Sequence, residues 1–341
     1  MRAVLIDHFI HRLHELQVSN VPTPNLSDNE LSIKVIGAGV NFVDTLYARG
    51  KHQNNRSLVR PPFTLGLEFS GVVVCAPPRS HLEPGDRVFG DAPGSYAEYI
   101  TLSEAAASGL RRVPPSWSLT DAAGLGATLP VSYGALKRAG LQPGETVLIH
   151  SAAGGLGIMA VQIAAALGCR VIGTAGSDEK CAYATSYGAS VCFNYSKDEW
   201  WEKILGYTDG VGAHVVFDPV GLVDLSLKCI AHMGRLLTVG FAGREGDMEN
   251  VAVNRLLLKQ VSLIGYRYGE TLRRHPEEKE QLWGEIEPLI AKGAIRPTVF
   301  KCYQGLESVV EALTNLLDRK VMGKAVIQVS DDDGNDTKAK L

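Results

Sequence analysis

The sequence predicts an α/β fold, with a doubly wound parallel sheet in the middle of the chain and an irregular β-rich domain before it. A glycine turn at 152–157 joins an apolar strand-like run to an apolar helix-like run. Short β-branched runs then alternate with helical stretches up to residue 266, a pattern typical of a parallel sheet covered by helices on both faces. The first 120 or so residues are instead rich in proline and glycine, which indicates an irregular β domain.

The first elements in the chain are short strands. Residues 1–5 (MRAVL) are predicted to form the first strand. Proline pairs at 61–62, 77–78 and 114–115 interrupt the region that follows, and 83–88 (EPGDRV) is predicted to turn into another strand.

The central turn is the strongest motif in the chain. A strand is predicted at 146–150 (TVLIH) and a helix at 158–164 (IMAVQIA), with the turn AAGGLG between them. Small residues at this point let the backbone approach a pyrophosphate, whose charge then lies against the helix N-terminus. The predicted contacts are Ala153, Gly154, Gly155, Leu156 and Gly157, although Ala152 stands where the usual motif has its first glycine. The turn therefore predicts a dinucleotide site.

The remaining elements complete the sheet and return to the first domain. Strands are predicted at 169–174, 189–195, 213–218, 235–240, 262–266 and 324–329, and helices from 178, at 277–292 and at 306–318. We expect a first domain over 1–122 that is completed by 274–329, a dinucleotide-binding domain over 123–273, and a disordered tail over 330–341.

Composition excludes several classes of function. The net charge of −3 gives no basic surface for nucleic acid, and Gly, Pro or charged residues break every apolar run before the roughly 20 residues that a membrane helix needs. The chain has six cysteines, none in C-x-x-C spacing, which is typical of reduced thiols in an intracellular protein. We therefore expect neither a nucleic-acid partner nor a membrane span.

Seven segments together carry a family resemblance. They are 39–46 (GVNFVDTL), 65–72 (LGLEFSGV), 84–88 (PGDRV), 94–99 (GSYAEY), 139–145 (AGLQPGE), the glycine turn, and 234–241 (GRLLTVGF). In this order they resemble the zinc-free quinone oxidoreductase branch of the medium-chain dehydrogenase/reductase superfamily. The resemblance implies an N-terminal GroES-like, β-barrel-like substrate domain, a central Rossmann domain with the cofactor cleft between the two, and a homodimer.

The resemblance also bears on zinc. Relatives that oxidise alcohols hold a catalytic zinc with a histidine in a Gly-His-Glu triplet and a cysteine shortly after the Gly-x-Asn position. Here the triplet reads Gly66-Leu67-Glu68, and residues 41–44 (NFVD) offer no thiolate. We therefore expect no metal, and an acceptor that is already electron-poor instead of an alcohol.

The end of the second strand predicts which nucleotide binds. An NAD enzyme presents an acid to the ribose hydroxyls about 20 residues after the glycines, whereas this chain reads GTAGS at 173–177. In the resembled family, positions like Lys180 and Tyr195 contact a 2′-phosphate, and Ser177 could join them. Each of the two also has a simpler interpretation, Lys180 as a solvated helix residue and Tyr195 as packing at a strand end. With Gly173, these residues make NADPH the expected cofactor.

The resemblance places further residues near the nicotinamide. Asn41 matches a position beside the nicotinamide ribose and the substrate, and Gly240 and Phe241 match a segment whose backbone passes the carboxamide. Tyr47 and His52 stand where the chain departs from the family pattern, and either could donate a proton to the reduced acceptor. The simpler interpretations are a turn asparagine for Asn41, half-buried packing for Tyr47, an exposed loop residue for His52 and core packing for Phe241.

We therefore expect an NADPH-dependent oxidoreductase that transfers hydride to a quinone or another electron-poor conjugated acceptor. Two alternatives remain at this point. One is an enone or enoyl thioester reductase, and the other is an NADPH-binding protein with a crystallin-like or RNA-binding role.

The chain ends in Ala339-Lys340-Leu341, which differs from the peroxisomal signal S-K-L by one residue. The expectation is import by the peroxisomal receptor if the source is eukaryotic, and a cytoplasmic location otherwise.

Overall fold

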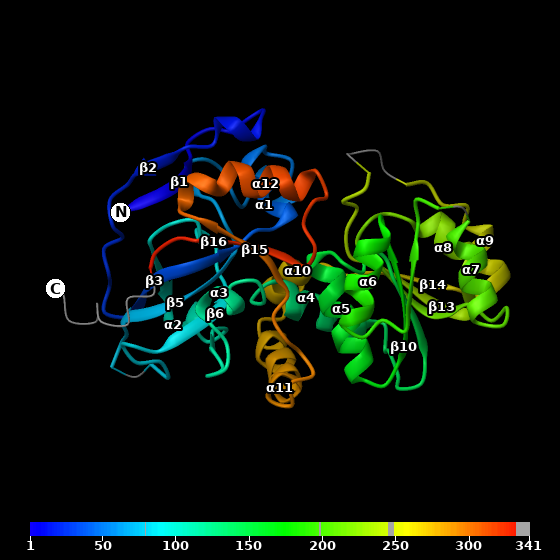
Figure 1. Ribbon diagram of the computed structural model, residues 1–341. Coiled ribbons are helices and arrows are strands. Elements are labelled where there is room, and N and C mark those ends of the chain that lie inside the picture. The colour runs from blue at the N-terminus through cyan, green and yellow to red at the C-terminus, as the bar shows by residue number, and fades with distance from the viewer. Residues whose placement is uncertain (79, 198, 245–248, 332–341) are drawn as a thin grey trace. The chain divides into compact units, whose positions relative to one another are not determined.

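The computed structural model describes residues 1–78, 80–197, 199–244 and 249–331 (Figure 1). Its contacts divide the chain into two compact units, 1–127 with 297–341 and 128–296. The α/β class and both expected domain types are present. The tail expected to be disordered, with its C-terminal tripeptide, lies from residue 332 outside the described residues.

The first unit is built on two sheets. Its strands are β1 (Arg2–Ile6), β2 (Val18–Asn20), β3 (Glu30–Gly39), β4 (Phe63–Thr64), β5 (Glu68–Cys75), β6 (Arg87–Asp91), β7 (Tyr99–Ser103), β8 (Arg111–Arg112), β15 (Val299–Gln304) and β16 (Lys324–Gln328). The order is β2-β1-β4 in the small sheet and β15-β16-β3-β5-β6-β8 in the large one, where β7 also pairs with β3. The last strand returns to this unit as expected, because β16 pairs antiparallel with β3.

The helices of this unit are short. They are α1 (Phe42–Ala48), α2 (Glu104–Ala107), α3 (Leu119–Ala122), α12 (Val309–Leu317) and the 3₁₀ helices η1 (Leu13–Glu15), η2 (Gln53–Arg56) and η3 (Leu306–Ser308). Helix α12 is amphipathic, and Val309, Ala312 and Leu313 enter the core of the unit. Helix α1 begins directly after β3, so its first turn is fixed to the centre of the large sheet.

The second unit is a six-stranded sheet with all strands parallel. Its strands are β9 (Thr146–Ile149), β10 (Arg170–Ala175), β11 (Val191–Asn194), β12 (Ala213–Asp218), β13 (Ile230–Thr238) and β14 (Ser262–Gly265), in the order β11-β10-β9-β12-β13-β14. The order reverses between β9 and β12. In sheets of this kind ligands bind outside the carboxyl ends of the strands at that reversal.

Helices cover both faces of the parallel sheet, with α5 and α6 on one side and α7, α8 and α9 on the other (Figure 1). The helices of the unit are α4 (Thr128–Arg138), α5 (Gly155–Ala166), α6 (Asp178–Ser186), α7 (Trp200–Tyr207), α8 (Val223–Cys229), α9 (Asn254–Lys259), α10 (Tyr268–Arg274) and α11 (Glu278–Ala291). The central residues of β9, β10 and β12 are apolar and fully buried because both faces of these strands are covered.

The domain boundaries differ from those expected. The first unit extends to residue 127, and residues 274–296, expected to complete it, belong to the second unit. The reason is the packing of α11, whose apolar face, with Leu282 and Trp283, is buried as the helix packs on α4. An ion pair between Lys137 Nζ and Glu285 Oε1 (2.6 Å) joins the same two helices.

No helix in the described ranges has both the length and the apolar character required to cross a bilayer.

Candidate functional site

The glycine turn lies at the carboxyl end of β9, beside the reversal in strand order. Ser151 adopts a φ of 50°, and its carbonyl accepts a hydrogen bond from Gly154 N (2.8 Å). The first hydrogen bond of α5 runs from Ile158 N to Gly154 O (2.8 Å). The amides of Gly155, Leu156 and Gly157 precede that bond, so they lie at the helix start, where an anion is stabilised.

Glycine is required at two positions around this turn. A Cβ on Gly157 would lie 2.0 Å from the carbonyl oxygen of Ser151, and a Cβ on Gly173 would lie 2.8 Å from the Cβ of Ala152. Ala152 itself is fully buried, and Ala153 is nearly so. The missing side chain of Gly173 therefore makes room for the alanine that replaces the usual first glycine.

The loop after β10 holds the residues expected to select the nucleotide. Ser177 caps α6 by accepting a hydrogen bond from Lys180 N (3.2 Å). The hydroxyl of Tyr195 would lie 2.8 Å from a Cβ placed on Gly176, so its ring lies against that glycine. The structure thus brings Ser177, Lys180 and Tyr195 together around one short loop, and Tyr195 is exposed at the strand end.

Two further residues of this region were missed by the sequence analysis. Lys197 Nζ lies 2.5 Å from Asp178 Oδ2, and Asn194 Nδ2 donates to Asp178 Oδ1 (2.9 Å). These contacts hold the pKa of Asp178 below its usual value, mainly through the hydrogen bond from Lys197. The signal available in the sequence was a run of polar residues directly after a strand. That run does not indicate that Lys197 contacts Asp178.

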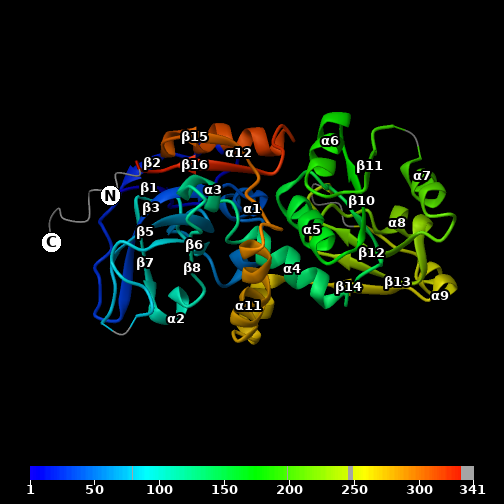
Figure 2. The same cartoon turned by 60° about the horizontal axis from the view of Figure 1, so that its bottom comes forward.

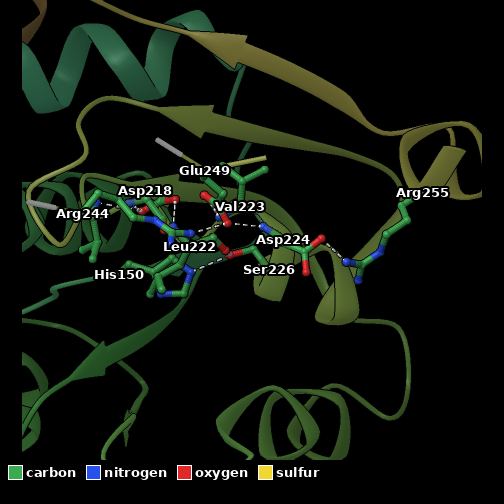
Figure 3. Close-up of polar contacts among 11 residues, drawn as sticks. His150, Asp218, Leu222, Val223, Asp224, Ser226, Arg244, Glu249 and Arg255 are labelled. Atoms are coloured by element: carbon green, nitrogen blue, oxygen red, sulfur yellow. Dashed lines mark hydrogen bonds and ion pairs between the residues drawn. The ribbon is translucent and has the colours of Figure 1, made fainter. Parts of the chain in front are cut away.

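The loops after β12 and β13 form the other side of the reversal. Asp218 accepts backbone hydrogen bonds from Val220 (2.8 Å), Gly221 (2.9 Å) and Leu222 (2.6 Å), which fixes the turn after β12 (Figure 3). Gly240 follows β13, and a Cβ there would lie 2.9 Å from the carbonyl oxygen of Pro219.

Phe241, next in the chain, is 39% exposed. The interpretation of Phe241 as core packing is therefore wrong.

A buried polar network supports these loops from beneath. His150 is fully buried, with Nε2 2.8 Å from Ser226 Oγ and Nδ1 2.8 Å from Thr174 Oγ1. Because the Ser226 hydroxyl donates its single hydrogen to Leu222 O (2.6 Å), the ring proton lies on Nε2. Burial holds the pKa of His150 below its ordinary value. The neutral ring therefore joins β9, β10 and α8.

A second carboxylate fixes the start of α8. Glu249 accepts from the amides of Val223 (3.0 Å) and Asp224 (2.8 Å), as Figure 3 shows. Arg244 Nη2 lies 2.9 Å from Glu249 Oε1 and its Nε donates to Gly221 O (2.8 Å). Arg244 thereby joins the two loops.

In the first unit, Asn41 belongs to a buried charged cluster. Its Nδ2 donates to Glu68 Oε2 (3.0 Å) and Gly39 O (3.2 Å), and its Oδ1 accepts from Lys324 Nζ (2.8 Å). Both amide hydrogens are therefore used inside the protein, and only an Oδ1 lone pair remains. Toward a ligand, Asn41 can act as an acceptor but not as a donor.

Glu68 and Lys324 form the ion pair of this cluster. Their side chains are 0% and 3% exposed, and Lys324 Nζ lies 2.7 Å from Glu68 Oε2. Lys324 Nζ also donates to Val40 O (3.0 Å), and Ala127 N donates to Glu68 Oε1 (2.7 Å). The charges are thus paired and hydrogen-bonded, as burial requires. Neither residue was among those predicted for the site.

Asp44 lies in the first turn of α1, which Asn41 directly precedes. Its Oδ2 accepts from Asn41 N (2.8 Å) and Tyr96 OH (2.6 Å), while Oδ1 has no hydrogen-bond partner within the described part of the chain. Burial raises the pKa of Asp44 to about 7. This carboxyl therefore titrates near neutral pH.

Tyr47 and His52 lie side by side. Their ring centroids are 4.2 Å apart. Asn54 joins them, because its Nδ2 donates to Tyr47 OH (2.8 Å) and its backbone N donates to His52 Nδ1 (3.2 Å). With Nδ1 accepting, neutral His52 carries its proton on Nε2. Tyr47 is buried and His52 half-buried, so His52 is not the exposed loop residue of the simpler interpretation.

The residues that stand where alcohol-oxidising relatives hold zinc do not fit a zinc ion. Leu67 stands at the histidine position, and the neighbouring Glu68 is held by Lys324 and Asn41. Across 1–78, 80–197, 199–244 and 249–331, no three His, Cys, Asp or Glu side chains are grouped as metal ligands. No step of the chemistry is therefore assigned to a metal.

Comparison with known proteins shows which families the chain resembles. Residues 27–112 match the family model described as "Alcohol dehydrogenase GroES-like domain", and 155–287 match "Zinc-binding dehydrogenase". The chain is 35% identical to the quinone oxidoreductase-like protein 2 homolog of Nematostella vectensis over 89% of this chain and 83% of that protein. It is 30% identical to quinone oxidoreductase of Homo sapiens over 88% of each chain.

Solved structures of oxidoreductases also resemble this chain. Quinone oxidoreductase of Escherichia coli, complexed with NADPH, has a TM-score of 0.84 at 26% identity and covers 96% of this chain and 100% of its own. The CurK enoyl reductase has a TM-score of 0.86 at 25% identity, covering 96% of this chain and 99% of its own. The chain is therefore an oxidoreductase of the medium-chain dehydrogenase/reductase superfamily and belongs to its quinone oxidoreductase branch.

Proposed function

We propose that this protein is an NADPH-dependent reductase that transfers hydride to a quinone or another electron-poor conjugated acceptor without zinc. The observation that carries the proposal is the glycine turn at the reversal of the parallel sheet, where a Cβ on Gly157 would meet Ser151. NADPH, when bound, supplies the hydride. The NADPH complex of the Escherichia coli relative supports the choice of cofactor.

The second unit supplies the groups for the nucleotide. The amides of Gly155, Leu156 and Gly157 would bind the pyrophosphate, because the start of a buried twelve-residue helix stabilises an anion. Ser177, Lys180 and Tyr195 would bind the 2′-phosphate. Gly240 and Phe241, in the loop after β13, would lie along the nicotinamide carboxamide.

The first unit supplies the groups for proton transfer and orientation. Reduction of a quinone to a hydroquinone takes one hydride and, at the second oxygen, one proton. Tyr47 OH and His52 Nε2–H are the candidate donors of that proton. Asn41, limited to accepting, would orient a hydroxyl donor such as one on a ribose, and it could not polarise a carbonyl acceptor.

Oxidation of NADPH and NADH against a panel of quinones, enones and enoyl thioesters tests this proposal. We expect NADPH oxidation with quinones. The likeness to the CurK enoyl reductase supports the alternative acceptor class, and activity with thioesters alone would establish that alternative. Binding of NADPH without oxidation by any acceptor would instead favour the non-catalytic role.

We also propose that the chain forms a homodimer. Strand β14 is an edge of the parallel sheet, and α9 and the residue before it present Val253 (73% exposed), Leu257 (76%) and Leu258 (76%). A row of unpaired strand amides beside exposed apolar side chains is typical of a surface that pairs with its own copy.

A further inference from the structure

Strand β11 packs against α6 (Figure 2), and contacts of the short segment that follows the strand place it beside the start of that helix. Tyr195 N donates to Ala175 O (3.0 Å), and Ser196 Oγ donates to Gly176 O (3.0 Å). These contacts fix residues 194–197 directly beside the loop that follows β10. The segment is therefore part of the proposed binding site for the nucleotide ribose.

Asp178 is the first acidic residue in the sequence after the loop that follows β10. It is the first residue of α6 and follows the N-cap Ser177. A carboxylate near this position has two possible effects on a nucleotide. It can accept hydrogen bonds from the 2′- and 3′-hydroxyls of NADH, and it repels the 2′-phosphate of NADPH.

Both oxygens of Asp178 are already bound by the segment after β11. Oδ2 is paired with Lys197 Nζ (2.5 Å) and Oδ1 accepts from Asn194 Nδ2 (2.9 Å). An exposed ion pair of this kind adds little to stability. Its effect on a nearby ligand is different, because Lys197 and Asn194 occupy both oxygens of Asp178 and keep the carboxylate from turning toward a ribose hydroxyl or a 2′-phosphate.

We infer that Lys197, assisted by Asn194, determines selectivity for the 2′-phosphate by holding the carboxylate of Asp178 away from the nucleotide. This inference rests on the proposed function, since it concerns how the same site selects NADPH. Lys197 acts through Asp178 and not by touching the phosphate. Removing Lys197 exposes a carboxylate that disfavours NADPH and offers acceptors to NADH.

A double-mutant cycle on the full chain tests this. The dissociation constants of NADPH and NADH are measured by quenching of tryptophan fluorescence for the wild type, Lys197→Gln, Asp178→Asn and the double variant. We expect Lys197→Gln to shift the ratio of the two constants about fivefold toward NADH, the upper end of what one exposed charge contact contributes. In the Asp178→Asn background the same substitution is expected to shift the ratio less than about twofold.

Lys203→Gln is the matched control, because Lys203 is an exposed lysine of α7 and the substitution changes the net charge equally. An equal loss of NADPH affinity from Lys197→Gln in both backgrounds would overturn the inference, since Lys197 would then act on the phosphate itself. An unchanged ratio would overturn it as well. A wild type that binds neither nucleotide, or prefers NADH, would overturn the proposed function together with the inference.

Discussion

Asn41 illustrates how a side chain's hydrogen-bond partners restrict its chemistry. That Asn41 lies at a ligand site stays a prediction, and its partners Glu68 and Lys324 could not be foreseen. Lys324 is 283 residues away in the chain, and no local pattern indicates such a contact. The sequence could therefore single out Asn41, whereas only the structure shows that its side chain is limited to accepting hydrogen bonds from a ligand.

The ion pair beneath Asn41 leads to the first prediction. Lys324→Met leaves Glu68 charged and unpaired in the core, so we expect a loss of about 3–5 kcal/mol in the free energy of unfolding. Glu68→Gln combined with Lys324→Met removes both charges and should recover part of that loss. Urea unfolding of the three variants and the wild type measures this. A double variant as unstable as Lys324→Met would contradict it.

Asp44 gives a prediction for pH dependence. Its pKa is about 7 in the folded chain, whereas an exposed aspartate has an ordinary pKa of 3.8. Because the folded pKa is the higher one, Asp44 contributes stability at low pH, and this contribution is lost as pH rises through 7. Between pH 6 and pH 8 this loss of stability is on the order of 1 kcal/mol.

Urea unfolding at pH 6 and pH 8 checks this prediction. Asp44→Asn should reduce the difference between the two pH values by that amount. The control Asp28→Asn changes an exposed acid of the same unit and should leave the difference unchanged. An Asp44→Asn variant that keeps the wild-type pH dependence would refute the assignment.

Among the elements, the turn from β9 to α5 was predicted best. Its strand, its glycines and its helix are adjacent in sequence, so the apolar runs and the turn residues indicate it directly. Helix α11 was predicted as a helix but assigned to the wrong domain. The apolar residues of α11, which include Leu282 and Trp283, would have the same spacing in either domain, so the spacing does not indicate the domain. The packing of α11 on α4 shows that the helix belongs to the second unit.

The turn yields a prediction at this scale. Gly157→Ala places a Cβ 2.0 Å from Ser151 O, so the start of α5 must shift, and we expect NADPH affinity to fall at least about tenfold, or 1.4 kcal/mol. Gly284→Ala is the control, because this glycine of α11 has open space around its Cβ position. It should leave affinity unchanged and add up to about 1 kcal/mol of stability. Equal affinities for the two variants would contradict a nucleotide site at α5.

For the whole molecule, the expected homodimer can be tested by mass. One chain weighs 36.7 kDa, and light scattering after size exclusion should give twice that value. Replacing Leu257 and Leu258 with Glu places charge on the exposed face of α9 and should yield monomers. Val211→Glu, an exposed apolar residue of the same unit, serves as the control and should remain dimeric. A wild type that is monomeric at micromolar concentration would contradict the proposal.

The reaction proposed for the whole molecule is hydride transfer from NADPH to an electron-poor conjugated acceptor without a metal. The most direct measurement mixes the chelator-treated protein anaerobically with equimolar NADPH and a benzoquinone and follows both compounds optically. We expect reduced nicotinamide to disappear in a one-to-one ratio with formation of hydroquinone, and faster than with NADH. No oxidation beyond the protein-free rate, or oxidation only after zinc is added, would contradict it.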